Sequence, residues 1–164
     1  MPKRRLVRAL RALALAVLFL APSARGELQA WDQTRVTRIA KDLANATGAL
    51  NQTFLEQSPP TPESMRSRSY YGLKHLVWIL DVQADLLAKA LEDGDGREQT
   101  LWIYTILVSD AQSARFEARG VFVAEDVGER AAAVRRVLNQ LGPYYDPDFQ
   151  TWAPDLKIEP PATR

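Results

Sequence analysis

The chain has 164 residues, of which 46% are hydrophobic and 25% are charged, with no cysteine and one histidine. This length suits one compact domain. The lack of cysteine excludes disulfides, Cys-ligated zinc or iron–sulfur sites and a thiol nucleophile within this chain. The single histidine also excludes any site that needs two imidazoles from one copy. The formal net charge of +1 hides an uneven distribution along the sequence.

The first 26 residues have the pattern of a secretory signal peptide. Five basic residues precede an uninterrupted apolar run from Ala12 to Ala21, and small residues follow at Ala24 and Gly26. We expect cleavage after Gly26, with cleavage after Ala24 as the alternative. The apolar run is about half of the ~20 residues that a membrane-spanning helix needs, so we expect no stable membrane anchor after cleavage.

Removal of residues 1–26 reverses the sign of the net charge. Six of the 21 basic residues and none of the 20 acidic residues lie in this segment, so the remaining chain has a net charge of −5. A mildly acidic chain is poorly suited to neutralise phosphates, and we therefore expect no nucleic-acid partner. The signal pattern predicts a periplasmic or secreted protein of a bacterial envelope.

The rest of the chain predicts helices joined by short connections. Apolar residues recur at spacings of three and four, which is typical of amphipathic helices. Pro59-Pro60 and Gly142-Pro143 are signals that end the first and the last helix. The expected helices cover residues 32–57, 61–92, 96–119 and 126–141.

Capping residues mark the expected connections. Gly94 can take the left-handed conformation that ends a helix. Asp95 with Glu98, and Asp126 with Glu129, have the three-residue spacing of a capping box. We therefore expect the third and fourth helices to be capped by these two aspartates.

Two helices carry more apolar residues than a single stripe requires. The second helix has an additional edge formed by His75, Ile79, Val82 and Leu86, and the third contains the apolar run 101–108. We expect the second helix to be buried on more than one face and the third on most of its circumference. The predicted fold class is all-α.

The predicted architecture is an up-down-up-down four-helix bundle over residues 27–143. Residues 144–164 contain four prolines and four aromatic residues. We expect this tail to be extended and packed on the bundle, with fraying after about residue 154.

The surplus apolar surface favours a non-catalytic protein that binds a protein partner or forms a homo-oligomer. Amphipathic aromatic residues dominate the energetics of interfaces. Five such residues are the expected anchors: Tyr70, Trp78, Tyr144, Tyr145 and Trp152.

An alternative is a bundle that binds a small molecule or a cofactor such as haem or a metal, with or without enzymatic activity. Its site would lie near Tyr71, His75 and Asp110. The only methionine after residue 26, Met65, is about 15 Å from His75 along the same helix, so the two cannot hold opposite faces of one iron. For the favoured, non-catalytic protein we expect no catalytic residues, no cofactor and no metal.

Overall fold

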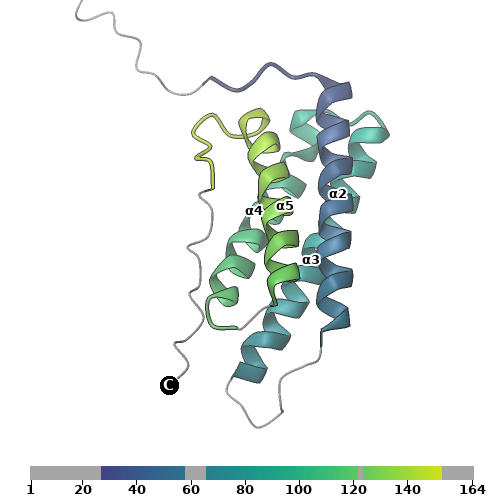
Figure 1. Cartoon of the computed structure of the whole chain (residues 1–164). Coiled ribbons are helices and arrows are strands. Elements are labelled where there is room, and N and C mark those ends of the chain that lie inside the picture. The colour runs from purple at the N-terminus through teal and green to yellow at the C-terminus, as the bar shows by residue number, and fades with distance from the viewer. Residues whose placement is uncertain (1–26, 58–65, 122–123, 153–164) are drawn as a thin grey trace, which may run out of the picture.

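The computed structural model describes residues 27–57, 66–121 and 124–152 (Figure 1). These residues form α-helices and one short 3-10 helix, and no strand lies among them, which confirms the predicted all-α class. The elements are α2 (Gln33–Glu56), α3 (Arg66–Glu92), α4 (Arg97–Ala118), α5 (Glu125–Leu141) and the 3-10 helix η1 (Gly142–Tyr144).

The helices pack through one buried stripe each. Helix α3 packs against α2 and α4, and α2 also packs against α5. Leu43, Leu87, Leu107 and Leu138 come from the four helices in turn, and all four side chains are fully buried. Because the burial of each such side chain contributes about 1.5–3 kcal/mol, the stripes hold the bundle together.

Helix α3 ends in a Schellman motif, which forms the connection to α4. Gly94 has φ 98°, as predicted, and its N–H donates to the carbonyl of Leu91 at 3.3 Å. The Asp95 N–H donates to the carbonyl of Ala90 at 3.0 Å. Asp95 therefore belongs to the end of α3.

Because Asp95 is engaged in this way, the prediction that it caps α4 is wrong. The N-cap is Gly96, whose N–H donates to Oε1 of Gln99 at 3.1 Å. At the next helix the prediction is wrong as well. The N-cap of α5 is Ala124. Asp126 lies inside the first turn, where its negative charge interacts favourably with the positive end of the helix dipole. The predicted start of the second helix at residue 61 lies outside the described residues.

Helix α5 ends at Leu141, where the sequence predicts it to end, but the geometry differs from a left-handed cap. Gly142 has φ −49°, and the chain continues into η1. A glycine is required here because a Cβ would overlap the ring of Phe149. Further along, the Trp152 N–H donates to Oδ1 of Asn139 at 2.9 Å. Residues 153–164 of the predicted tail lie outside the described residues.

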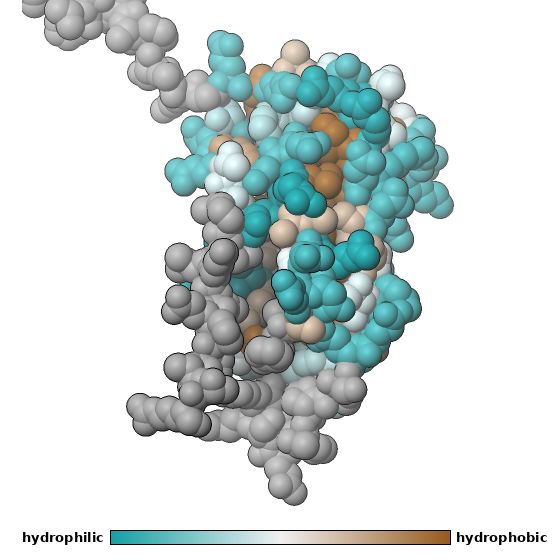
Figure 2. Space-filling view, viewed as in Figure 1, coloured by the Kyte–Doolittle hydropathy of each residue, from teal (hydrophilic) through white to brown (hydrophobic). Residues whose placement is uncertain are grey.

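The face over α2 and α5 is largely hydrophilic. Figure 2 shows it from the same side as Figure 1, with a small apolar strip where the two helices meet and a few scattered apolar spots elsewhere. On α2 the solvent-facing residues include Arg38, Lys41 and Asp42, and Lys41 forms a salt bridge with Glu92 of α3. Such exposed ion pairs contribute little to stability, but they keep this side of the bundle polar.

Candidate functional site

The large hydrophobic side chains that remain exposed are concentrated on α3 and α4. Leu55 on α2 is the one such residue outside these two helices in the described part of the chain. The others are Tyr71, Trp78, Val82 and Leu86 on α3, and Leu101, Trp102, Ile106 and Phe116 on α4.

This distribution corrects two expectations from the sequence. Val82 and Leu86, from the additional edge of α3, are exposed rather than buried, and so is much of the apolar run in α4. The reason is that the bundle covers only the inward stripe and the flanks of each helix. No further described element packs over the outward sides of α3 and α4.

On α3 the exposed apolar residues follow a heptad spacing. Tyr71, Trp78 and Asp85 occupy one heptad position, and His75, Val82 and Lys89 occupy the other. All six residues are exposed, and Trp78 stacks on His75 with 5.9 Å between ring centroids. Leu86 extends the apolar area beside this stripe. The stripe is the pattern of a helix that packs against another helix, but it points to solvent.

Helix α4 repeats the pattern with fewer apolar residues. Trp102, Ser109 and Phe116 share one heptad position, and Ile106 and Ser113 share the other, with all five exposed. Trp102 and Phe116 expose 57% and 70% of their surface. A ring as exposed as that of Phe116 contributes little to the core of the bundle.

The two stripes are joined where α3 packs on α4. The Nε2 of Gln83 donates to Oδ2 of Asp110 at 2.7 Å. Leu86 is three residues from Gln83 and Ile106 is four residues from Asp110, so both flank this hydrogen bond. We call the set formed by these exposed residues the outer face: Tyr71, Trp78, Val82, Leu86, Trp102, Ile106 and Phe116.

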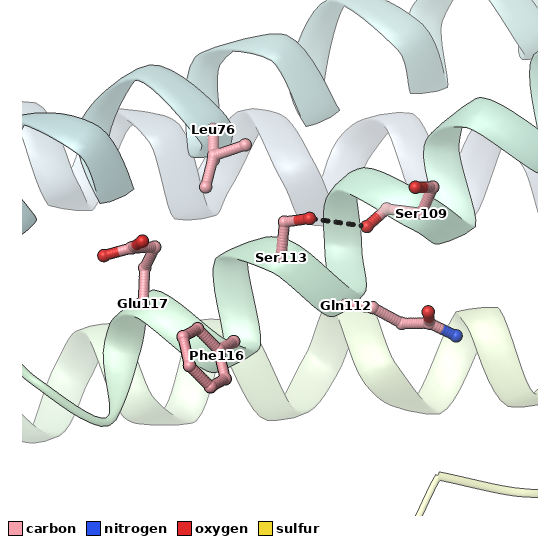
Figure 3. A pocket seen from close by; sticks show the side chains of 6 residues that line it. All are labelled: Leu76, Ser109, Gln112, Ser113, Phe116 and Glu117. Atoms are coloured by element: carbon pink, nitrogen blue, oxygen red, sulfur yellow. Dashed lines mark hydrogen bonds between the residues drawn. The ribbon is translucent and has the colours of Figure 1, made fainter.

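A shallow hollow of about 380 Å³ lies beside Phe116 at the α3–α4 junction. Figure 3 shows Leu76 of α3 pointing toward Ser113 of α4, whose hydroxyl donates to the carbonyl of Ser109 at 3.0 Å. Glu117 is a further lining residue, while Phe116 projects away from α3. The hollow is open to solvent, and it continues the outer face rather than forming an enclosed ligand site.

The structure places the five expected anchors in different environments. Trp78 lies on the outer face with 53% of its surface exposed. Tyr70, Tyr144 and Tyr145 are core residues, so the expectation that they contact a partner is corrected. Trp152 is partly buried against the core, and its backbone is bonded to Asn139.

Tyr144 and Tyr145 are buried in an aromatic cluster that the sequence patterns did not reveal, whereas Tyr70 stacks on Phe54. The rings of Tyr104 and Tyr145 stack with centroids 4.3 Å apart, and Trp31 meets Tyr145 edge-on at 5.5 Å. The guanidinium of Arg97 lies 5.2 Å from the Trp31 ring centroid. The hydroxyls of Thr100 and Tyr145 share a hydrogen bond of 2.8 Å. These contacts join residues from three separate segments, so no local spacing could reveal them.

Burial changes the acidity of these phenols. Desolvation raises the pKa of Tyr104 far above its ordinary value, and the charges of Asp146 and Tyr145 add to the effect. Desolvation also raises the pKa of Tyr145, although the Thr100 hydrogen bond and Arg97 oppose it. Both phenols are therefore held neutral by burial, which suits a structural role in the core.

The residues of the alternative ligand site are not gathered around one cavity. Tyr71 and His75 lie on the solvent side of α3, and His75 stacks on Trp78. Asp110 is held by Gln83, which is two turns away from His75 along α3. The hollow beside Phe116 is lined by none of the three.

Comparison with family models, curated proteins and solved structures found no match to this chain. Within residues 27–57, 66–121 and 124–152, no group of three or more His, Asp or Glu side chains is arranged to hold a metal ion. Over the same residues no helix is long and apolar enough to cross a membrane. The outer face is the feature of the described chain that most needs a functional explanation.

Proposed function

We propose that this protein is a non-catalytic, exported helical bundle that acts by binding protein through the outer face of α3 and α4. The observation that carries the proposal is the heptad-spaced stripe on α3, which is exposed along its whole length. In the free chain this stripe keeps apolar surface in contact with water, which is unfavourable. A partner that covers the stripe removes this surface from water, which favours binding.

The size of the outer face supports a binding role. Its residues expose about half of their surface each, which amounts to an apolar area on the order of 700 Å² when aromatic side chains contribute 150–250 Å² each. The largest apolar patch of an ordinary monomer is about 300–600 Å². Stable interfaces bury about 800 Å² per partner.

The kind of residues on this face also supports the proposal. Trp78 and Trp102 are amphipathic, and tryptophan is enriched among the residues that dominate binding energy. Each brings a large rigid surface with few rotatable bonds, so little side-chain entropy is lost on binding. Asp85 and Lys89 lie in the same stripe, and charged groups of both signs favour a protein partner over a lipid surface.

We also infer that the helices alternate in direction, up-down-up-down. The supporting contacts join the start of α2 to the end of α3, where Nε2 of Gln33 donates to the carbonyl of Leu91 at 2.8 Å. At the same end, the guanidinium of Arg97 at the start of α4 donates to the carbonyl of Gln29 at 2.9 Å. The stack of Tyr104 on Tyr145 brings the chain after α5 to α4. The Asn139–Trp152 pair similarly supports packing of the tail on the bundle.

Export is proposed from the sequence of residues 1–26 alone. Its test is the mass and N-terminal sequence of the protein recovered from the envelope fraction or the medium. A chain that begins at Glu27 supports cleavage after Gly26. A chain that retains Met1, or that is recovered from the cytoplasm, contradicts export.

The binding function is tested by photo-crosslinking in the cells that make the protein. A photoreactive phenylalanine analogue replaces Trp102 on the outer face, and in a control chain it replaces Arg136, an exposed residue of α5. We expect a discrete crosslinked protein product from position 102 and none from position 136. Equal labelling from both positions, or none from position 102, overturns the proposal. The product is identified by mass spectrometry, which distinguishes a second copy from another protein.

A further inference from the structure

We infer that the occupant of the outer face is a second copy of this chain, with the two α3 helices antiparallel about a two-fold axis at the level of residue 80. This inference rests on the proposed binding function and names its partner. It requires that the α3 stripe be complementary to itself. Two-fold dimers are the commonest oligomers, and their interface uses the same patch on both copies.

The spacing of the α3 stripe meets this requirement. Antiparallel alignment about the level of residue 80 places Trp78 of one copy opposite Val82 of the other, and the reverse. The same alignment places each residue of one heptad position opposite a residue of the other position. The large indole then lies at the centre of the interface against a smaller β-branched side chain, which allows the two helices to interdigitate.

The charges in the stripe select the antiparallel direction. In that alignment His75 of one copy faces Asp85 of the other, and Lys89 faces Tyr71, whose ring can accept a cation. A parallel alignment would instead place Asp85 against Asp85 and Lys89 against Lys89. Like charges that face each other oppose association. Four of the six stripe residues therefore favour one direction of packing.

The available area matches a dimer of this kind. The outer face without Phe116 exposes an apolar area on the order of 600 Å² on each copy, which approaches the roughly 800 Å² per partner of a stable interface. Leu86, Trp102 and Ile106 extend the contact on the side of α3 that packs on α4. A membrane surface is a poorer occupant because Asp85 lies within the stripe, and transfer of a carboxylate toward lipid is costly.

The test is a charge swap in the chain from Glu27 to Arg164, measured by sedimentation velocity over a concentration series. Asp85→Lys places a cation opposite His75, and His75→Glu places a carboxylate opposite Asp85. We expect each single change to weaken self-association by about tenfold, since every dimer contains the pair twice. The double variant, His75→Glu with Asp85→Lys, is expected to return to within about threefold of the original chain.

Asp42→Lys, an identical charge change on the exposed side of α2, is the matched control. It is expected to leave self-association unchanged. All substituted side chains are exposed, so circular dichroism is expected to show intact helices in each variant.

A dimer that both single changes weaken and the double change restores supports the inference. A dimer that is insensitive to the swap, or that is not restored by it, overturns the antiparallel α3 pairing. A chain that stays monomeric at every concentration overturns self-association, and so does flotation of a monomer with phospholipid vesicles. Neither result decides the proposed function, because the crosslink from position 102 reports any protein partner separately.

Discussion

Helices α2 and α5 differ from α3 and α4 in what they present to solvent. On α2 and α5 the apolar residues form a single inward stripe, and the outward residues are mostly polar, as the face in Figure 2 shows. On α3 and α4 a second set of apolar residues points outward at heptad spacing. Both pairs contribute to the same core, but the core leaves eight large hydrophobic residues of α3 and α4 exposed. The proposed interface explains the seven of these that form the outer face.

Two neighbouring residues of α3 are expected to differ most in their contribution to stability. Leu87 is fully buried, and Leu86, one residue earlier, exposes 45% of its surface. We expect Leu87→Ala to lower the free energy of unfolding by about 2–5 kcal/mol, because it leaves a cavity in the core. Leu86→Ala is expected to change it by about 0.5 kcal/mol or less in the monomer. Urea unfolding at low protein concentration measures both values, and equal losses would contradict the assignment of Leu86 to a solvent-facing surface.

Two glycines lie at positions that differ in how closely they are covered by neighbouring side chains. At Gly142 the ring of Phe149 occupies the space of a Cβ, whereas at Gly72 on α3 nothing lies within 4 Å of that position. Gly142→Ala is expected to destabilise the protein by about 1–3 kcal/mol through overpacking. Gly72→Ala is expected to stabilise it by about 0.5–1 kcal/mol, since it removes a glycine from a helix interior. Thermal unfolding of the two variants is the measurement, and a loss of stability in Gly72→Ala would show that this flank is covered.

Because of the aromatic cluster, we expect the free energy of unfolding to decline at high pH. Burial raises the pKa of Tyr104 and Tyr145 above the ordinary value of 10.0, so the unfolded chain releases these protons first. Their contribution is fully present below pH 10 and is lost as the pH rises above it. We expect a slope of up to about 1.4 kcal/mol per pH unit for each tyrosine. Tyr104→Phe is expected to reduce this slope in urea unfolding between pH 9 and pH 11.5. An unchanged slope would mean that Tyr104 does not ionise differently in the two states.

The existence of the helices followed from the sequence because apolar spacing is a local property. The capping residues of α4 and α5 did not, since Asp95 lies in the turn that ends α3 and Ala124, which supplies no capping side chain, is the N-cap of α5. Local spacing placed His75 and Val82 of the α3 stripe on an additional apolar edge, but it could not say which of the two apolar edges the bundle covers. That choice depends on how many neighbouring helices each helix has.

The candidate site was anticipated only in part for the same reason. Trp78 was expected on a surface and lies on one, whereas Tyr144 and Tyr145 are buried by contacts with Trp31 and Tyr104. An aromatic residue near the end of a chain has the same local pattern whether it packs inward or binds a partner. Phe116 was missed as a surface residue because its neighbours Ala114 and Ala118 belong to the inward side of the same helix.

We propose that the outer face points to solvent in the isolated chain and is covered by protein in its native setting. Hydroxyl-radical footprinting tests it most directly, with the oxidation rates of Trp78, Trp102 and Phe116 compared between dilute purified protein and intact cells. We expect fast oxidation of all three in the dilute protein and marked protection in cells, with Trp31 slow in both as an internal reference because it packs against the core. Slow oxidation of the three residues in the dilute protein, or rates that do not change in cells, would contradict it.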